Sequence, residues 1–301
     1  MKKKTNSEST ISLIIPTLNP GCAFESVVNS IFSQTMIPDE IIIVDSSSTD
    51  GSLDFINGKK RISLYKVERS SFDHGRTRDF AIRKASGEFI IMLTQDALLY
   101  DKYSIEYLVG AIAKDDRIAV VGGKQIAYPQ ARNAEKLIRQ FNYTDKSSCW
   151  SKKAISELGI KAFMISDVFA IYRRSAYFDC GGFDFPILTN EDMLMAQKFL
   201  EHDYLIGYES SACVYHSHDY TLRQEYMRNK NIGYTLEVFK KRFNDISEYG
   251  RGFDLVIYVS LRLLKGLHFI SFVLFGLNCI ARILGNRAGR RLARRSACGQ
   301  G

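Results

Sequence analysis

The segment Ile11–Thr17 (ISLIIPT) and the turn residues Asn19–Gly21 (NPG) that follow it decide the fold class of this 301-residue chain. A short apolar run closed by such a turn is typical of a strand that is buried on both faces. Apolar side chains then recur at helical spacing from Phe24 to Ile31. The chain therefore opens with a strand, a turn and a helix.

The same alternation continues through the first hundred residues. Apolar runs at Glu40–Asp45, Ile62–Val67 and Glu88–Thr94 predict three more strands, and Arg76–Ala85 predicts a helix before the last of them. Strands rich in β-branched residues that alternate with helices predict an α/β fold, whose mainly parallel central sheet is covered by helices on both faces.

The pattern between residues 100 and 242 is more mixed but continues the alternation of strands and helices. The expected strands are 118–121, 169–172 and 204–208, and the expected helices are 103–113, 190–200 and 220–242. Six cysteines are scattered without a C-x-x-C pair, which argues against a disulfide framework and a structural zinc site. No apolar signal region precedes the first strand, so we expect this part of the chain in a reducing cytoplasm.

Positive charge is concentrated at the carboxyl terminus. The formal net charge is +8, and the eight arginines and lysines after Asp254 account for all of it because no acidic residue follows. A basic tail on a neutral domain predicts an anionic surface as its partner, either lipid headgroups or nucleic acid. The tail directly follows an apolar run and lacks interleaved aromatic residues, so nucleic acid ranks last and we expect none.

The segment Gly266–Ala281 carries no formal charge and holds many large apolar side chains. Sixteen helical residues span about 24 Å, which is short of a hydrocarbon core of about 30 Å. A helix lying flat on the membrane or re-entering it, with arginines on the headgroups, is therefore favoured over a full span. A helical hairpin buried in the protein itself is a third possibility.

Polar residues follow the predicted strands where sheets of this class bind ligands. Asp45 can accept hydrogen bonds from a base or a ribose, or it can belong to a helix N-cap region. Asp96 can be a ligand for Mg²⁺ or Mn²⁺ beside a diphosphate, or an acid in a turn at the strand end.

Further candidates lie later in the chain. Glu191 and Asp192 open a predicted helix, where the helix dipole favours acids in any case, and either could act as a general base. His216 and His218 could complete a metal site, bind phosphate or lie in solvent. Arg76 and its neighbour Arg78, at the entry to a helix, could bind phosphate oxygens or be ordinary surface residues.

The order and spacing of these segments resemble the family 2 glycosyltransferases of GT-A fold over about residues 10–240. The resemblance lies in five segments taken together: Ile14–Asn19, Ile43–Gly51, Leu93–Asp96, Asn190–Asp192 and Val214–His216. Three shorter segments are also similar to bacterial rhamnosyltransferases that build surface polysaccharides: Phe72–Gly75, Gln95–Ala97 and His216–Leu222. Thr94 stands where the family usually has the first acid of an Asp-x-Asp motif.

The resemblance implies a role for each candidate. Asp192 would be the catalytic base, with Glu191 beside it as an acid that positions the acceptor or as the base itself. Asp96, His216 and His218 would bind Mg²⁺ or Mn²⁺. The residues implied for the donor nucleotide sugar are Pro16, Thr17, Asn19, Asp45, Ser47, His74, Gly75, Arg76, Gln95 and Asp96.

The function implied by this resemblance is inverting transfer of a sugar, with L-rhamnose from dTDP-β-L-rhamnose as the expected donor. The expected acceptor is a glycan linked to polyprenyl diphosphate, in the synthesis of O-antigen at the cytoplasmic face of the bacterial inner membrane. The implied division is a flexible amino terminus (1–9), a catalytic domain (10–242) and a helical, basic segment (243–301), with residues 255–295 bound peripherally to an anionic membrane surface.

Two alternatives remain open. One is the same fold and mechanism with a UDP-sugar or a GDP-sugar as the donor. The other is a membrane-bound protein that binds nucleotide sugars without catalysis, which Thr94 favours because it removes one carboxylate from the metal site. The presence of Asp96, Asp192 and His216 argues against the second alternative.

Overall fold

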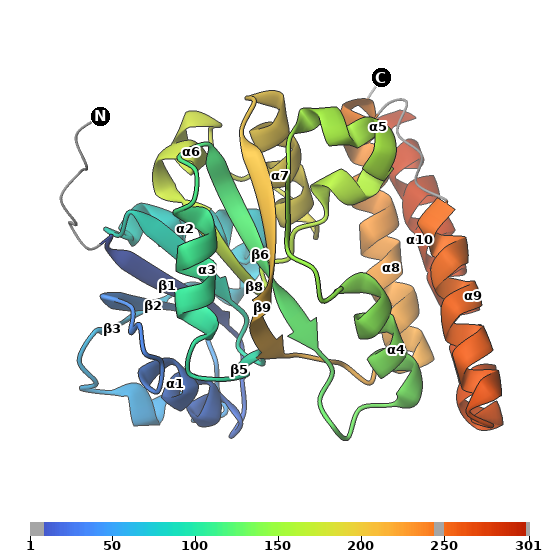
Figure 1. Cartoon of the computed structure of the whole chain (residues 1–301), viewed down its shortest axis with the longest axis horizontal. Coiled ribbons are helices and arrows are strands. Elements are labelled where there is room, and N and C mark those ends of the chain that lie inside the picture. Colours follow the sequence, from blue (N-terminus) through green and yellow to red (C-terminus); the bar gives the residue numbers. More distant parts are fainter. Residues whose placement is uncertain (1–8, 244–249, 299–301) are drawn as a thin grey trace.

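A nine-stranded sheet with helices on both faces forms the main body of the molecule (Figure 1). The computed structural model describes residues 9–243 and 250–298, so most of the amino-terminal segment that the sequence predicts to be flexible lies outside the described residues. The strand order is β3-β2-β1-β4-β8-β6-β9-β5, and β7 pairs with β9. The strands are β1 (Ile11–Thr17), β2 (Glu40–Asp45), β3 (Ile62–Lys66), β4 (Phe89–Leu93), β5 (Leu98–Leu99), β6 (Ile118–Ile126), β7 (Ser148–Trp150), β8 (Phe169–Arg173) and β9 (Leu205–Tyr215).

The helices are found where the apolar periodicity predicts them, together with shorter ones that it missed. The main helices are α1 (Phe24–Phe32), α2 (His74–Lys84), α3 (Ser104–Ile112), α4 (Asn133–Asn142), α5 (Ile155–Leu158), α6 (Arg174–Asp179), α7 (Glu191–Glu201), α8 (Leu222–Val238), α9 (Gly250–Lys265) and α10 (Phe269–Cys298). Short 3₁₀ turns lie at Asp54–Ile56, Arg69–Ser71, Lys152–Ala154, Gly159–Phe163 and Lys240–Phe243.

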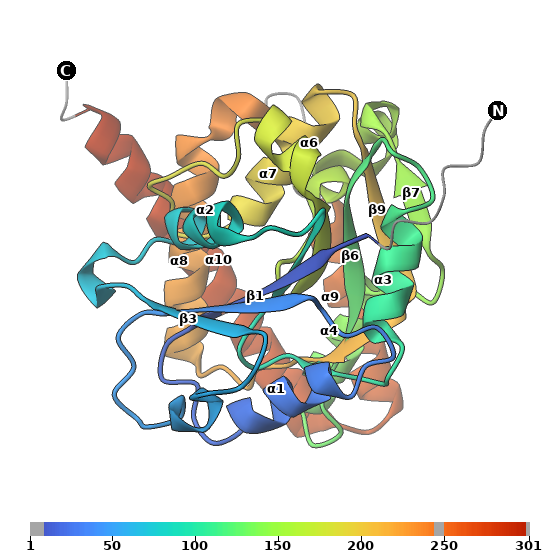
Figure 2. The same ribbon diagram turned by 90° about the vertical axis from the view of Figure 1, so that its left-hand side faces the viewer.

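Two apolar layers cover the sheet because successive side chains of a strand point to opposite faces. Ile14 of β1 belongs to the layer with α2 and α7, whereas Leu13 and Ile15 belong to the layer with α1 and α3. Figure 2 shows α1 and α2 on opposite sides of β1 and β3. The fully apolar runs of the sequence are thus explained by burial on both faces.

The sheet is parallel in one half and mixed in the other. Strands β3, β2, β1 and β4 are parallel, as the sequence predicts, but β8 lies antiparallel between β4 and β6. Phe169, at the start of β8, is therefore opposite Leu93, at the end of β4. As a result, the residues just before β8 lie at the same edge as the residues that follow β1, β2, β4, β6 and β9.

The last two helices form an antiparallel hairpin against α4 and α8, on the right of Figure 1. Val259 and Leu263 of α9 and Phe275 of α10 form a small buried cluster with apolar residues of α4. The outer faces stay apolar and exposed: Ile257 is 56% exposed and Ile270 is 79% exposed. One face of the hairpin is therefore packed against the protein, as in the buried helical hairpin considered for this segment. Its other face is apolar and uncovered.

Helix α10 packs closely along α8 through glycines and ion pairs. A Cβ atom at Gly289 would overlap the backbone of α8. Arg282 forms a bidentate ion pair with Glu225, and Arg290 and Arg294 pair with Glu237. The expectation that the basic tail as a whole lies on headgroups is wrong for these three arginines, because two acidic side chains of α8 face them.

Candidate active site

Polar residues from five strands meet at one edge of the sheet. Thr17 ends β1 and pairs in register with Asp45, which ends β2. Asp96 follows β4 by three residues, and His216 follows β9 directly. The carboxyl ends of the parallel strands, where α/β sheets usually bind ligands, and the start of the antiparallel β8 lie together here.

Asp45 organises the loop after β2. Its side chain is buried and accepts hydrogen bonds from the Oγ of Ser48 at 2.5 Å and from the Ser48 backbone amide at 3.1 Å. The hydroxyl of Thr17 lies 3.4 Å from the same carboxylate. Ser47, which adopts a positive φ of 64°, donates its hydroxyl to the backbone of Val67. The carboxylate of Asp45 is thus held in a turn, not in a helix N-cap.

The loops after β1 and β4 are joined to this turn by side-chain hydrogen bonds. The side-chain oxygen of Asn19 accepts from the backbone amide of Thr49 at 2.8 Å. The backbone amide of Asn19 donates to the hydroxyl of Ser48 at 2.8 Å. Gln95 accepts from the backbone amide of Leu18 at 2.8 Å. The structure therefore brings Pro16, Thr17, Asn19, Asp45, Ser47 and Gln95 of the predicted donor-binding set into one group of loops.

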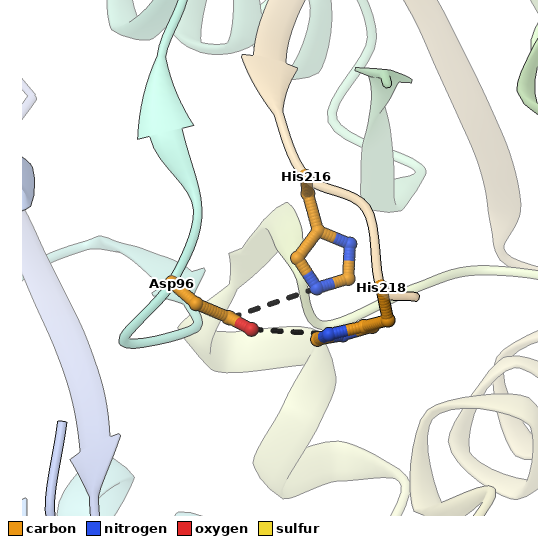
Figure 3. A group of neighbouring side chains, drawn as sticks. All are labelled: Asp96, His216 and His218. Carbon is orange, nitrogen blue, oxygen red and sulfur yellow. Dashed lines mark ion pairs between the residues drawn. The ribbon is translucent and has the colours of Figure 1, made fainter. Parts of the chain in front are cut away.

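Asp96, His216 and His218 form a compact cluster (Figure 3). Each residue offers one ligand atom, and these atoms lie within 4.8 Å of one another. Nε2 of His216 lies 3.6 Å from Asp96 and Nε2 of His218 lies 3.5 Å from it. The two imidazole rings are nearly perpendicular, and His218 also stacks on Tyr220.

The tautomer of His216 follows from the residue behind it. Nδ1 of His216 lies 2.9 Å from Oε1 of Gln125. A guanidinium can only donate, and Arg139 donates to that same Oε1, so this oxygen is an acceptor and Nδ1 carries the proton. The lone pair of His216 is then on Nε2, which faces Asp96. This is the arrangement that supports histidine as a metal ligand.

The electrostatics of the cluster suit a cation. Burial works against ionisation of Asp96, but the neighbouring His216 and His218 outweigh burial and lower its pKa. Burial, followed by the neighbouring His216, lowers the pKa of His218 to about 4. One carboxylate and two imidazoles are a donor set that fits a divalent transition metal such as Mn²⁺.

Asp192 lies in the first turn of α7 with two acidic neighbours. Its carboxylate accepts hydrogen bonds from the backbone amides of Met193 at 2.8 Å and Asp167 at 3.3 Å. Burial, then the charges of Glu191 and Asp167, raise the pKa of Asp192 well above its usual range. A raised pKa makes this half-buried carboxylate a stronger base than an ordinary aspartate.

Glu191 is engaged in a buried ion-pair network and is not free to face an acceptor. Nη1 of Arg78 lies 3.0 Å from Glu191, and Nε of Arg78 lies 3.1 Å from Asp167. The hydroxyl of Tyr172 donates to Asp167 at 2.6 Å. One buried guanidinium is therefore shared by two of the three neighbouring carboxylates.

The tripeptide Ser166–Val168 joins this network to the metal-binding cluster. Ser166 accepts from Gln125, the residue that supports His216. Asp167 binds Arg78 and donates its backbone amide to Asp192, and the carbonyl of Val168 accepts from the amide of Thr94. These three residues lie just before β8, so the antiparallel direction of β8 places them between the two groups.

The remaining predicted donor-binding residues lie on the side of α7. His74 is within 3.9 Å of Glu191, and a Cβ at Gly75 would overlap the backbone carbonyl of Asp184. The guanidinium of Arg76 lies over the ring of Phe185. Among the residues that the structure describes, no hydrogen bond or ion pair joins these three residues to the Asp45 or Asp96 groups.

Sequence reasoning missed Gln125 and Asp167. An acid directly before an apolar strand was the available signal for Asp167, but a strand start normally lies away from the ligand-binding edge. Gln125 is the only polar uncharged side chain in the run Ile118–Ile126. A polar residue that is buried at the end of a strand needs a partner, which could have singled it out.

Comparison with known proteins shows the family of this chain. Residues 12–180 match the family model described as Glycosyl transferase family 2. The chain is 40% identical over 224 residues to the O-antigen chain rhamnosyltransferase RfbN of Salmonella typhimurium, covering 74% of this chain and 71% of that protein. It is 36% identical over 226 residues to the O-antigen chain rhamnosyltransferase WbaN of Salmonella anatum, with the same coverage.

Solved structures share the fold at low sequence identity. A mannosyltransferase from Pyrobaculum calidifontis, solved with GDP-Man and Mn²⁺, is 16% identical with a TM-score of 0.59, covering 97% of this chain and 81% of that one. TarS 1–349 of S. aureus, solved with UDP, is 18% identical with a TM-score of 0.60, covering 96% and 92%. The family match covers more than half of the sequence, and the predicted GT-A fold and glycosyltransferase activity are confirmed: the chain belongs to glycosyl transferase family 2.

Proposed function

We propose that the protein is an inverting rhamnosyltransferase that transfers L-rhamnose from dTDP-β-L-rhamnose to a lipid-linked glycan during O-antigen assembly. The names of the two Salmonella relatives support the sugar and the process. The observation that supports this chemistry is that Ser166–Val168 connects the cluster of Asp96, His216 and His218 to the carboxylate of Asp192.

The donor diphosphate would lie beside Asp96, with the nucleoside in the loops around Asp45. The buried carboxylate of Asp45 and the side chain of Asn19 offer acceptors for a base or a ribose. A cation held by Asp96, His216 and His218 would offset the negative charge on the departing nucleoside diphosphate. Two imidazole nitrogens favour Mn²⁺ over Mg²⁺, which prefers oxygen ligands.

Asp192 would accept the proton of the acceptor hydroxyl. Its raised pKa supports this role, because a carboxylate with a higher pKa holds a proton more strongly. Attack of that hydroxyl on the anomeric carbon, opposite the leaving group, inverts the configuration in a single displacement. The β-linked donor would then give an α-linked product, without a covalent intermediate on a carboxylate.

The apolar hairpin would bind the enzyme peripherally to the cytoplasmic face of the inner membrane. By length and composition, Phe269–Ser296 could cross a membrane. Yet Arg282, Arg290 and Arg294 bind α8, so a spanning α10 would have to leave α8 or bring its acids into lipid. A hairpin lying in the interface keeps these pairs and buries the exposed apolar faces.

The donor assignment is tested by incubating the purified protein with Mn²⁺, a lipid-linked acceptor and labelled nucleotide sugars. We expect transfer of rhamnose from dTDP-β-L-rhamnose, with little from UDP-sugars or GDP-sugars. Efficient transfer from one of the latter, with none from dTDP-β-L-rhamnose, would overturn the donor. Donor binding without any transfer would instead indicate the non-catalytic alternative.

A further inference from the structure

A groove of about 650 Å³ lies between α4 and the turn that joins α9 to α10. We call it the basic groove, and its polar walls are Lys136 and Gln140 of α4 with Arg262, Lys265 and His268 of the hairpin. It lies outside the sheet, and none of the residues assigned above to the donor, the metal or the base lines it.

The basic groove has positive charge without compensation among the described residues. No acidic side chain lines it, and within the described ranges 9–243 and 250–298 no acid pairs with Lys136, Arg262 or Lys265. The arginines of α10 that bind α8 show the contrast, because each has an acidic partner. Arg262 is also held over the ring of Tyr258, at 4.6 Å from its centroid. Neighbouring cations repel one another, so an anion here relieves an unfavourable arrangement.

Exposed apolar side chains are next in sequence to the hairpin residues that line the basic groove. Leu264, Leu267, Phe269 and Ile270 belong to the same turn, and the last three are 58% to 79% exposed. They continue the apolar outer face of the hairpin described above. A ligand that satisfies both features has an anionic head and a hydrocarbon chain, so it is an amphiphile within a membrane.

The groove lies one helix away from the metal-binding cluster. Lys136 and Gln140 line it from α4, whereas Arg139 of the same helix reaches Gln125, the support of His216. At the start of α4, Arg132 lies 3.5 Å from Asp219 in the loop after His218. Because a helix with its side chains is about 10 Å across, a bound headgroup would lie close to the active site.

We propose that the basic groove binds the diphosphate of a lipid-linked glycan acceptor, which rests on the function proposed above. Several positively charged side chains around one groove match the two adjacent phosphates of a diphosphate better than the single phosphate of a bulk phospholipid. The hydrocarbon chain lies along the exposed face of α9 and α10, and the glycan extends past α4 toward Asp192. The hairpin thus holds the acceptor lipid as well as the enzyme at the membrane.

The test is co-flotation of the full-length protein with vesicles of three compositions. The first is phosphatidylcholine alone, the second adds a polyprenyl diphosphate, and the third adds phosphatidylglycerol to the same surface charge. We expect the polyprenyl diphosphate to strengthen binding about tenfold more than phosphatidylglycerol does. The variant Lys136→Gln/Lys265→Gln should lose this gain.

A matched control removes the same charge elsewhere. Lys152→Gln/Lys153→Gln alters two exposed lysines that do not line the groove and should keep the preference for the diphosphate. Equal binding to both anionic vesicles by the wild type would overturn the proposal in favour of bulk headgroups. An unchanged preference in the groove variant would overturn it as well. Thermal unfolding of each variant shows whether the fold is kept.

A kinetic arm separates this inference from the proposed function. With a soluble glycan acceptor that lacks the lipid diphosphate, the groove variant should transfer rhamnose at the wild-type rate. With the lipid-linked acceptor, its KM should rise about tenfold while kcat is kept. Loss of transfer by the wild type to both acceptors would contradict the proposed function, whereas the flotation result would still decide the groove.

Discussion

Nε of Arg78 lies 3.1 Å from the carboxylate of Asp167, and both side chains are buried. The same guanidinium binds Glu191. Helix α2, the start of β8 and the start of α7 are therefore held together by one cation next to Asp192. Burial, and then the excess of negative over positive charge that this arrangement leaves, raises the pKa of Asp192.

The substitution Asp192→Asn should remove transfer and keep donor binding. The amide fills the same space but cannot accept the acceptor proton, so we expect kcat to fall by roughly 10²–10⁴-fold. Calorimetry with the donor and Mn²⁺ should give an affinity close to that of the wild type. Glu191→Gln provides the comparison, and a greater loss of kcat there than in Asp192→Asn would reassign the base.

The pH dependence of transfer should report the charges around Asp192. The active form is the carboxylate, so kcat/KM should rise with pH through the raised pKa of Asp192. Asp167→Asn removes one negative neighbour, which lowers that pKa and moves the acidic limb of the profile to lower pH. A limb that stays in place would show that Asp167 does not act on the base.

Replacing Arg78 should destabilise the fold strongly. Arg78→Gln leaves Asp167 and Glu191 buried without a cation, which should lower the free energy of unfolding by about 3–5 kcal/mol. Arg83→Gln is the control on the same helix, because its pair with Asp79 involves an exposed guanidinium and should cost less than about 1 kcal/mol. Urea denaturation measures both, and equal losses would contradict the buried network.

Metal binding should depend on Gln125, although this residue would act on the metal only through His216. Gln125→Leu removes the acceptor that holds the Nδ1 proton of His216, so the affinity for Mn²⁺ should fall by about 10–100-fold. Electron paramagnetic resonance of free Mn²⁺ gives the affinity directly. Gln34→Leu replaces another buried glutamine that lies in a different part of the fold and should leave it unchanged.

Membrane binding should depend on the outer face of the hairpin. Ile270→Asp places a charge in the most exposed large apolar position among the described residues, so the fraction bound to vesicles should fall by at least about tenfold. Ile37→Asp makes the same change at an exposed position between α1 and β2, and its binding should match that of the wild type. Co-sedimentation with anionic vesicles compares the two, and equal losses would contradict a specific membrane face.

Several features of this protein follow from the sequence alone. Local periodicity predicts the first four strands and the helices between them. A strand buried on both faces must be apolar throughout, and a helix must repeat its apolar residues every three to four positions. The positions of Asp45, Asp96, Asp192 and His216 follow in turn, because strand ends and helix starts mark where polar side chains reach the ligand-binding edge.

Tertiary structure decided what depends on residues far apart in the chain. The antiparallel direction of β8 moved Asp167 to the ligand-binding edge, and no local pattern specifies the direction of a strand that is apolar on both faces. Gln125 contacts His216, which lies 91 positions later in the chain, and Glu225 forms an ion pair with Arg282, which lies 57 positions later. The charge and hydrogen-bonding state of such side chains depends on which partner packing brings within a few ångströms, and that information is not contained in either segment by itself.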